Sequence, residues 1–108
     1  MSPTTEVSGG SAANTTAGIA SFGGRAAFVG RIADDTFGAV FAHDLRSAGV
    51  HFDPPIATGP DPTGRCLVMV TPDAHRTMCT HLGASIELGP DDVDEALVRD
   101  SAVTYLEG

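Results

Sequence analysis

A Gly-Gly-Ser-Ala-Ala-Asn segment, residues 9–14, opens a run with helical character that extends from Ala12 to Phe22 and ends at Gly23-Gly24. Glycines have no Cβ and tolerate positive φ, so the backbone here can approach a ligand closely. The start of a helix presents unpaired N–H groups and a positive dipole end, which suit hydroxyl or anionic ligands. Asn14 adds a carbonyl and an amide in the first turn. These residues indicate a small-molecule site, although a tight turn into a helix has the same pattern.

Other residues with potential chemistry do not form a metal site. Asp34 and Asp35 are adjacent, and neighbouring side chains rarely converge on one ion, whereas a helix N-cap explains them fully. The histidines lack the spacing of zinc ligands relative to either cysteine; they are His43, His51, His75 and His81. The sequence therefore predicts no metal ligands.

The elements that would position these residues alternate between strand and helix. A near-continuous apolar run predicts a strand over 26–32 that is covered on both faces. After the Asp34-Asp35 cap, apolar residues recur at helical spacing until Gly49 ends the helix; they are Phe37, Val40, Phe41, Leu45 and Ala48. The stretch from His51 to Gly64 is predicted to be a connection.

A β-hairpin is predicted from strands Arg65–Val70 and Arg76–His81, which flank the turn-forming residues 71–75. A loop centred on Asp73-Ala74 pairs Val68 with Cys79 and Cys66 with His81. Both cysteines would then share a face on a diagonal of about 7–8 Å, too long for a disulfide, which predicts two free thiols. In this register one face carries Leu67, Met69, Met78, Thr80 and Leu82, and the other Cys66, Val68, Val70, Thr77, Cys79 and His81.

The C-terminal part is predicted to return to the core. Gly89-Pro90-Asp91-Asp92 would open a third helix, with Val93, Leu97 and Val98 facing inward. Residues 102–106 would follow as a buried strand. Alternating strands and helices with an inserted hairpin predict an α/β protein with a layered sheet.

The order of these motifs resembles the N-terminal signature of the PfkB-type carbohydrate kinases, the ribokinase-like family. The Gly-Gly-x-x-x-Asn segment is followed by Thr15-Thr16, Gly23, the strand-like run and Asp34-Asp35-x-x-Gly38. Residues 76–84 look most like the adenosine kinase branch, and the resemblance covers 7–108. One departure is Ala33, where the family usually has glycine before the paired aspartates.

The resemblance implies a partial ribokinase-like fold, in which the hairpin, residues 63–84, is a lid over the sugar site. Members are roughly three times longer, beyond the usual size of one compact unit. Residues 1–108 would be an incomplete N-terminal part of the kinase domain, without the Gly-Ala-Gly-Asp motif, the catalytic base or the ATP site. This chain alone is therefore expected to be inactive and to hold no catalytic residue.

The implied activity is ATP- and Mg-dependent phosphorylation of a sugar hydroxyl, on adenosine or another ribose-like acceptor. The resemblance assigns acceptor binding to the first helix and to the lid; these residues are Gly9, Gly10, Ser11, Asn14, Met78, Thr80 and Leu82. Arg76 follows the hairpin turn and would either reach phosphate oxygens or remain solvated. In some members two lids pair with each other, so the resemblance also implies a possible homodimer formed through the hairpin.

Composition limits the other partners. The chain has 108 residues, a net charge of −8 and a pI of about 4.6, which argues against nucleic acid. It has no apolar run of membrane-spanning length and no signal-peptide layout, and we expect a cytoplasmic protein. The alternative function is a small α/β nucleotide-binding module without catalysis. A dinucleotide fold fits poorly, because residues 9–14 lack the third glycine of its motif.

Overall fold

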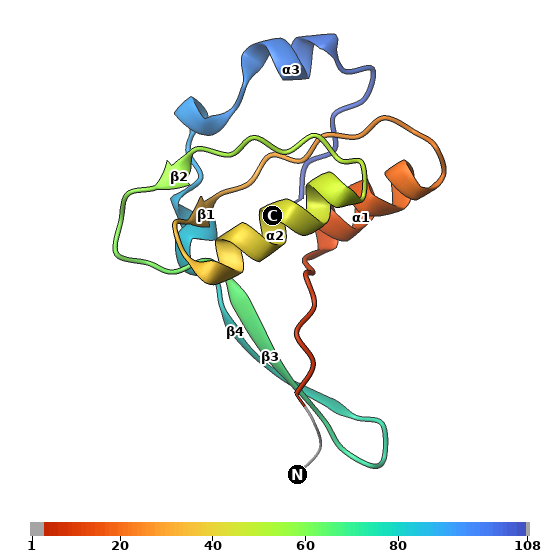
Figure 1. The fold of residues 1–108 in the computed structure, drawn as a ribbon, viewed down its shortest axis with the longest axis vertical. Coiled ribbons are helices and arrows are strands. Elements are labelled where there is room, and N and C mark those ends of the chain that lie inside the picture. Colours follow the sequence, from red (N-terminus) through yellow and green to blue (C-terminus); the bar gives the residue numbers. More distant parts are fainter. Residues whose placement is uncertain (1–3, 108) are drawn as a thin grey trace.

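Two helices occupy the middle of the protein, and a long β-hairpin projects away from them (Figure 1). This computed structural model describes residues 4–107. The helices are α1 (Ser11–Ser21), α2 (Thr36–Ser47) and α3 (Glu95–Asp100), and the strands are β1 (Ile32–Ala33), β2 (Ile56–Ala57), β3 (Arg65–Val70) and β4 (Arg76–His81). Short 3₁₀ helices cover Gly83–Glu87 and Pro90–Asp92. The architecture is α/β with small sheets, as the sequence predicts.

The main core lies between α1, α2 and the segment after each of them. Its buried members are Ala13, Ile32, Ala42, Leu45, Val50 and Phe52. Phe28, Phe41 and Phe52 form an aromatic cluster beside it, with ring centroids 5.4 to 5.9 Å apart and two of the three pairs edge to face. Burial of this apolar surface is what holds α1 against α2.

Both long helices begin and end close to the predicted residues. Gly10 precedes α1 with φ of 102°, and Gly49, with φ of 89°, ends the turn after α2. Asp35 is the N-cap of α2, and its side chain accepts a hydrogen bond from the Gly38 N–H at 2.8 Å. The capping interpretation of the paired aspartates is therefore confirmed for Asp35.

The strand predicted over 26–32 is only partly realised. Ala27 makes one parallel bridge with His51, and the regular strand is β1, which pairs in parallel with β2. The predicted connection from 51 to 64 thus supplies both partners. A strand needs a neighbouring strand to form hydrogen bonds with its backbone N–H and C=O groups. Within the described residues, this segment has such a neighbour only at Ala27 and at β1.

Three C-terminal predictions were wrong, and one of them is that Val93 and Val98 face inward, since both are exposed. The third helix begins at Glu95 rather than at Pro90, because Asp94 provides the cap, accepting from the N–H groups of Ala96 and Leu97. Residues 102–106 are neither paired nor buried within the described chain, and Tyr105 and Leu106 are largely exposed. An extended apolar segment forms a strand only against another strand, and residues 4–107 place none beside it.

The hairpin has the predicted strands but a different register. Val68 pairs with Met78 and Cys66 with Thr80, one residue away from the predicted pairing. The loop has an odd number of residues, since the Thr71 N–H donates to the His75 carbonyl at 3.0 Å and Ala74 takes a left-handed conformation with φ of 66°. A type I turn followed by a left-handed residue is a common three-residue loop, which the even-numbered prediction overlooked.

The corrected register changes the two faces of the hairpin. One face carries Cys66, Val68, Val70, Arg76, Met78 and Thr80, and the other carries Arg65, Leu67, Met69, Thr77, Cys79 and His81. Cys66 and Cys79 therefore lie on opposite faces, and both thiols are free, as predicted. Leu82 follows β4 and lies outside the ladder. In the part of the chain described, no helix has the length and apolar character needed to cross a membrane.

Gly38 in the first turn of α2 provides a stability test. A Cβ there would lie 2.3 Å from the Ala33 carbonyl oxygen and 2.9 Å from Thr63 Oγ1. We expect Gly38→Ala to lower the free energy of unfolding by roughly 1–3 kcal/mol, because the backbone must shift. Urea unfolding followed by circular dichroism measures the change.

The matched control is Gly18→Ala in α1, where a Cβ would meet no atom within 4 Å. Alanine in a helix interior should stabilise this protein by up to about 1 kcal/mol. Equal effects of the two substitutions would show that Gly38 is not closely packed.

Candidate functional site

The predicted acceptor-binding turn is open and lacks a capping side chain. Gly10 precedes α1 with φ of 102°, and no side chain bonds to the first N–H groups of the helix. A Cβ at Gly9 would meet no atom within 4 Å, so the space beside it is free. The Asn14 N–H donates to the Gly10 carbonyl at 2.8 Å, which fixes the first turn, while Ser11 and Asn14 are exposed. The turn offers free N–H groups and one amide to a ligand.

The predicted lid residues lie on a separate arm of the molecule. Every residue of β3 and β4 is exposed, including Arg76, Met78 and Thr80. In Figure 1, the segment before α1 and the hairpin both extend toward the lower side of the view. Ser8 in that segment donates to Asp44 near the end of α2, whereas the hairpin root is bound to Asp35 at the start of α2. None of the hydrogen bonds found within residues 4–107 joins the two groups. The side chains of the turn and of the lid are therefore not joined within the described residues.

A junction that the sequence did not predict ties the hairpin to the body. Thr63 is buried, and both its N–H and its hydroxyl donate to the Asp35 carboxylate, at 2.9 and 2.6 Å. Thr63 Oγ1 also accepts from the Ala33 N–H at 2.9 Å. Because Asp35 caps α2 through Gly38, one carboxylate joins β1, α2 and the start of the hairpin.

The second strand of the hairpin returns to the same place. The Ala84 N–H donates to the Pro62 carbonyl at 2.7 Å, and Ala84 is fully buried. Gly83 has φ of 54°, and a Cβ there would lie 2.0 Å from the Pro62 oxygen. A Cβ at Gly64 would lie 2.7 Å from the Leu82 oxygen. The two lid roots, 62–64 and 82–84, therefore pack backbone against backbone.

A second polar cluster holds the segment after the hairpin. Arg31 Nη1 donates to the Glu87 carbonyl at 2.8 Å and to Asp92 Oδ2 at 3.0 Å. Asp92 Oδ2 also accepts from the Gly89 N–H at 2.8 Å. The arginine side chain is largely buried, which makes these charge-assisted bonds stronger than exposed ones. This cluster fixes the 3₁₀ helices against the segment that leads into β1.

The junction changes the acidity of Asp35. Burial is the largest single cause and would raise the pKa of its carboxyl. The hydrogen bonds from the Thr63 hydroxyl and from the Thr63 and Gly38 N–H groups, with the charge of Arg65, outweigh it. The pKa of Asp35 is therefore lowered, and the carboxylate is held in its charged form.

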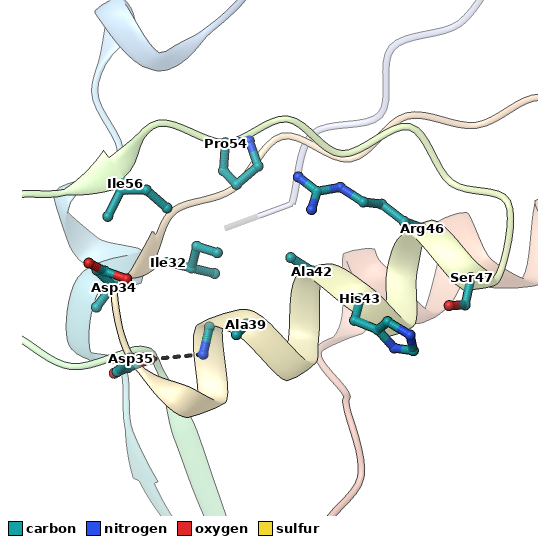
Figure 2. Close-up of a pocket in the computed structure, with 12 residues that line it drawn as sticks. Ile32, Asp34, Asp35, Ala39, Ala42, His43, Arg46, Ser47, Pro54 and Ile56 are labelled. Atoms are coloured by element: carbon teal, nitrogen blue, oxygen red, sulfur yellow. Dashed lines mark hydrogen bonds between the residues drawn. The ribbon is translucent and has the colours of Figure 1, made fainter.

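A pocket of about 610 Å³ lies between α2 and the strands β1 and β2 (Figure 2). Asp34 and Ile56 line it near the strands, and Arg46 lies along α2, where its Nε donates to the Phe52 carbonyl at 3.0 Å. The lining includes none of the residues predicted to bind substrate. The pocket is thus distinct from the acceptor turn and from the lid.

The described residues do not fit a magnesium site. Within 4–107, no three His, Cys, Asp or Glu side chains converge in a way that would hold a metal ion. Asp35 is engaged by Thr63 and Gly38, and Asp34 is exposed at the rim of the pocket. We therefore derive no step through a metal from these residues.

The family profile described as pfkB family carbohydrate kinase matches residues 2–108, nearly the whole chain. The chain belongs to this family. The pfkB assignment confirms the resemblance carried by the Gly-Gly-x-x-x-Asn segment and the residues that follow it.

Solved structures of other pfkB-like kinases share the fold. The adenosine kinase from Sinorhizobium meliloti is 52% identical, with a TM-score of 0.85 over 93% of this chain and 31% of that one. A probable sugar kinase from Rhizobium etli is 48% identical, with a TM-score of 0.84 over 93% of this chain and 30% of the other. The predicted partial ribokinase-like fold and the similarity to an adenosine kinase are confirmed.

Plant fructokinases are more distant relatives. Probable fructokinase-2 of Arabidopsis thaliana is 31% identical over 90% of this chain and 30% of its own length. The chain thus spans about 30% of the length of these three relatives.

The lowered pKa of Asp35 predicts a pH-dependent contribution to stability. A group whose pKa is depressed on folding stabilises the protein above its unfolded pKa, about 3.9, and loses that contribution as the pH falls through the folded value. The stability difference between wild type and Asp35→Asn should therefore be largest near neutral pH and shrink on acidification. Urea midpoints between pH 7 and pH 3 measure it.

Asp34→Asn is the control, since it removes the adjacent charge but none of the junction hydrogen bonds. A pH-dependent difference as large for Asp34→Asn as for Asp35→Asn would contradict this account of the junction.

Proposed function

We propose that this chain supplies the acceptor-binding turn and the lid of an ATP-dependent sugar or nucleoside kinase. The observation that carries the proposal is the geometry at Gly9-Gly10, where a positive φ and an uncapped helix start leave N–H groups free beside open space. Asn14 stands in the same turn, and its amide can donate to one hydroxyl and accept from its neighbour. Together they suit the vicinal hydroxyls of a sugar ring.

Within that class we favour adenosine or another ribose-like acceptor. Support comes from the higher identity to the Sinorhizobium meliloti adenosine kinase than to the plant fructokinases. A nucleoside carries a flat apolar base beside its hydroxyls, so its site needs apolar cover as well as hydrogen-bond partners.

The lid would provide that cover. Arg76, Met78 and Thr80 share one face of the hairpin in the corrected register. Met78 is flexible and apolar and would pack on the base, and Arg76, nearer the tip, would reach phosphate oxygens. Leu82, at the root, would close the side of the site next to the body.

ATP and magnesium would supply the phosphoryl group and the charge neutralisation of this chemistry. The described residues offer no metal ligand set, and we assign the turn and the lid positioning alone. The catalytic base and the nucleotide site would belong to the two thirds of the relatives' length that this chain does not match.

We also propose a small-molecule acceptor and no nucleic-acid partner, in a cytoplasmic protein. The net charge of −8 and the two free cysteines support this. The lid face that carries Leu67, Met69 and Cys79 exposes these apolar side chains, and a second copy's lid would cover them in a homodimer.

The test is a chimera in which this chain replaces the matching part of the Sinorhizobium meliloti adenosine kinase. We expect the chimera to phosphorylate adenosine and the 108-residue chain alone to show no phosphotransfer. In the chimera, Asn14→Ala should raise KM for the acceptor by roughly 5- to 150-fold, the equivalent of losing a hydrogen bond worth about 1–3 kcal/mol. Steady-state kinetics measure this.

Thr15→Ala is the matched control, because Thr15 is exposed on the same turn and bonds only to the Ser11 carbonyl of its own helix. A fall in melting temperature with unchanged substrate constants would make Asn14 a structural residue. ATP binding by the isolated chain would favour the alternative of a nucleotide-binding module without catalysis.

A further inference from the structure

We propose that Thr63 and Asp35 are positioning residues that fix the direction in which the hairpin stands relative to the acceptor turn. The inference that this direction matters for acceptor binding rests on the proposed kinase function. The inference that these two residues fix it rests on the contacts at the lid roots alone.

The first step is that the hairpin is held only at its base. All residues of β3 and β4 are exposed, and their ladder bonds join the two strands to each other. Beyond the roots, the hydrogen bonds found within residues 4–107 connect no part of the hairpin to α1, α2 or α3. The orientation of such an arm is decided where it meets the body.

The second step is that the two lid roots meet in a close backbone contact, which by itself sets little direction. Gly83 and Gly64 each lie where a Cβ would strike a carbonyl oxygen of the opposite root, at 2.0 and 2.7 Å. Glycines permit this approach, but they leave the backbone free to rotate. Between the two roots, the backbone hydrogen bond from the Ala84 N–H to the Pro62 carbonyl is what limits rotation.

The third step is that a side chain, Thr63, fixes the direction of the root at 62–64. Thr63 Oγ1 donates to Asp35 and accepts from the Ala33 N–H, so a single hydroxyl is bound from both the α2 cap and β1. The Thr63 N–H adds a bond to the second Asp35 oxygen. These bonds fix both the Thr63 rotamer and the backbone immediately before Gly64.

The test measures lid direction without any reference to activity. In the 108-residue chain, Cys66→Ser leaves Cys79 as the one hairpin thiol, and Ser47→Cys at the exposed end of α2 provides the second label. Nitroxide labels on both report the distance distribution by double electron–electron resonance.

We expect a narrow distribution in this background and in Thr63→Ser, which keeps the hydroxyl. Thr63→Val keeps the shape but loses the hydroxyl, and the width of its distribution should roughly double as the arm explores more orientations. Circular dichroism checks that each variant is folded. If Thr63→Val does not fold, Asp35→Asn, which still caps α2 but loses a carboxylate oxygen, should broaden the distribution instead.

Unchanged widths in folded Thr63→Val, or equal broadening in Thr63→Ser, would overturn the inference. A second readout uses the chimera with the Sinorhizobium meliloti enzyme, where Thr63→Val should raise KM for the acceptor more than it lowers kcat and Thr63→Ser should restore both. If the label distances broaden in Thr63→Val but the chimera is inactive, the positioning role is supported and the kinase function is not. If the chimera is active but the label distances do not change in Thr63→Val, the kinase function is supported and the positioning role is overturned.

Discussion

The Asp35 carboxylate is the interaction on which the rest of this structure depends. It accepts hydrogen bonds from the Gly38 N–H, the Thr63 N–H and the Thr63 hydroxyl, at 2.6 to 2.9 Å. A helix cap, the end of a strand and the start of the hairpin therefore share one charged group. Because a partly buried carboxylate is costly without partners, losing any of these donors would weaken all three elements.

The packing around this carboxylate explains why small residues surround it. Gly38 brings α2 against the Ala33 carbonyl, Ala84 is fully buried, and Gly83 takes a left-handed conformation against Pro62. Ala33 is buried with Ala57 and Ala84 in a second small cluster. The site proposed here thus has a fixed part, the start of α1, and an arm whose direction is set at this junction.

The sequence predicts the local elements well because their signals are local. The glycine pair, the Asp35 cap and the alternating apolar residues define α1, α2 and the hairpin with small errors at their ends. The predicted hairpin register was wrong because the observed one requires Ala74 to adopt a positive φ. Alanine rarely does so, and the sequence around it gives no sign of it. The strand predicted over 102–106 failed because strand formation needs a neighbour that the described residues do not contain.

In the candidate site, too, residues with a local sequence signal were predicted and residues that meet only in the fold were not. Gly9, Gly10 and Asn14 are recognised by spacing along one helix turn, whereas the Asp35–Thr63 pair joins residues separated by 28 positions. No periodicity links two such residues, and only the fold brings them together. Their one visible signal is the position of Thr63 directly before Gly64 at the start of a predicted strand.

Hydrogen exchange of the backbone amides tests this account most directly, because protection reports how each region opens. If Asp35 and Thr63 hold the hairpin to the body, the amides of Gly38, Thr63 and Ala84 should exchange slowly and together, as one unit with the core of α2. The amides of β3 and β4 should exchange faster than these. Exchange at Thr63 and Ala84 as fast as in the hairpin, with Gly38 still protected, would contradict the claim that this carboxylate joins the two.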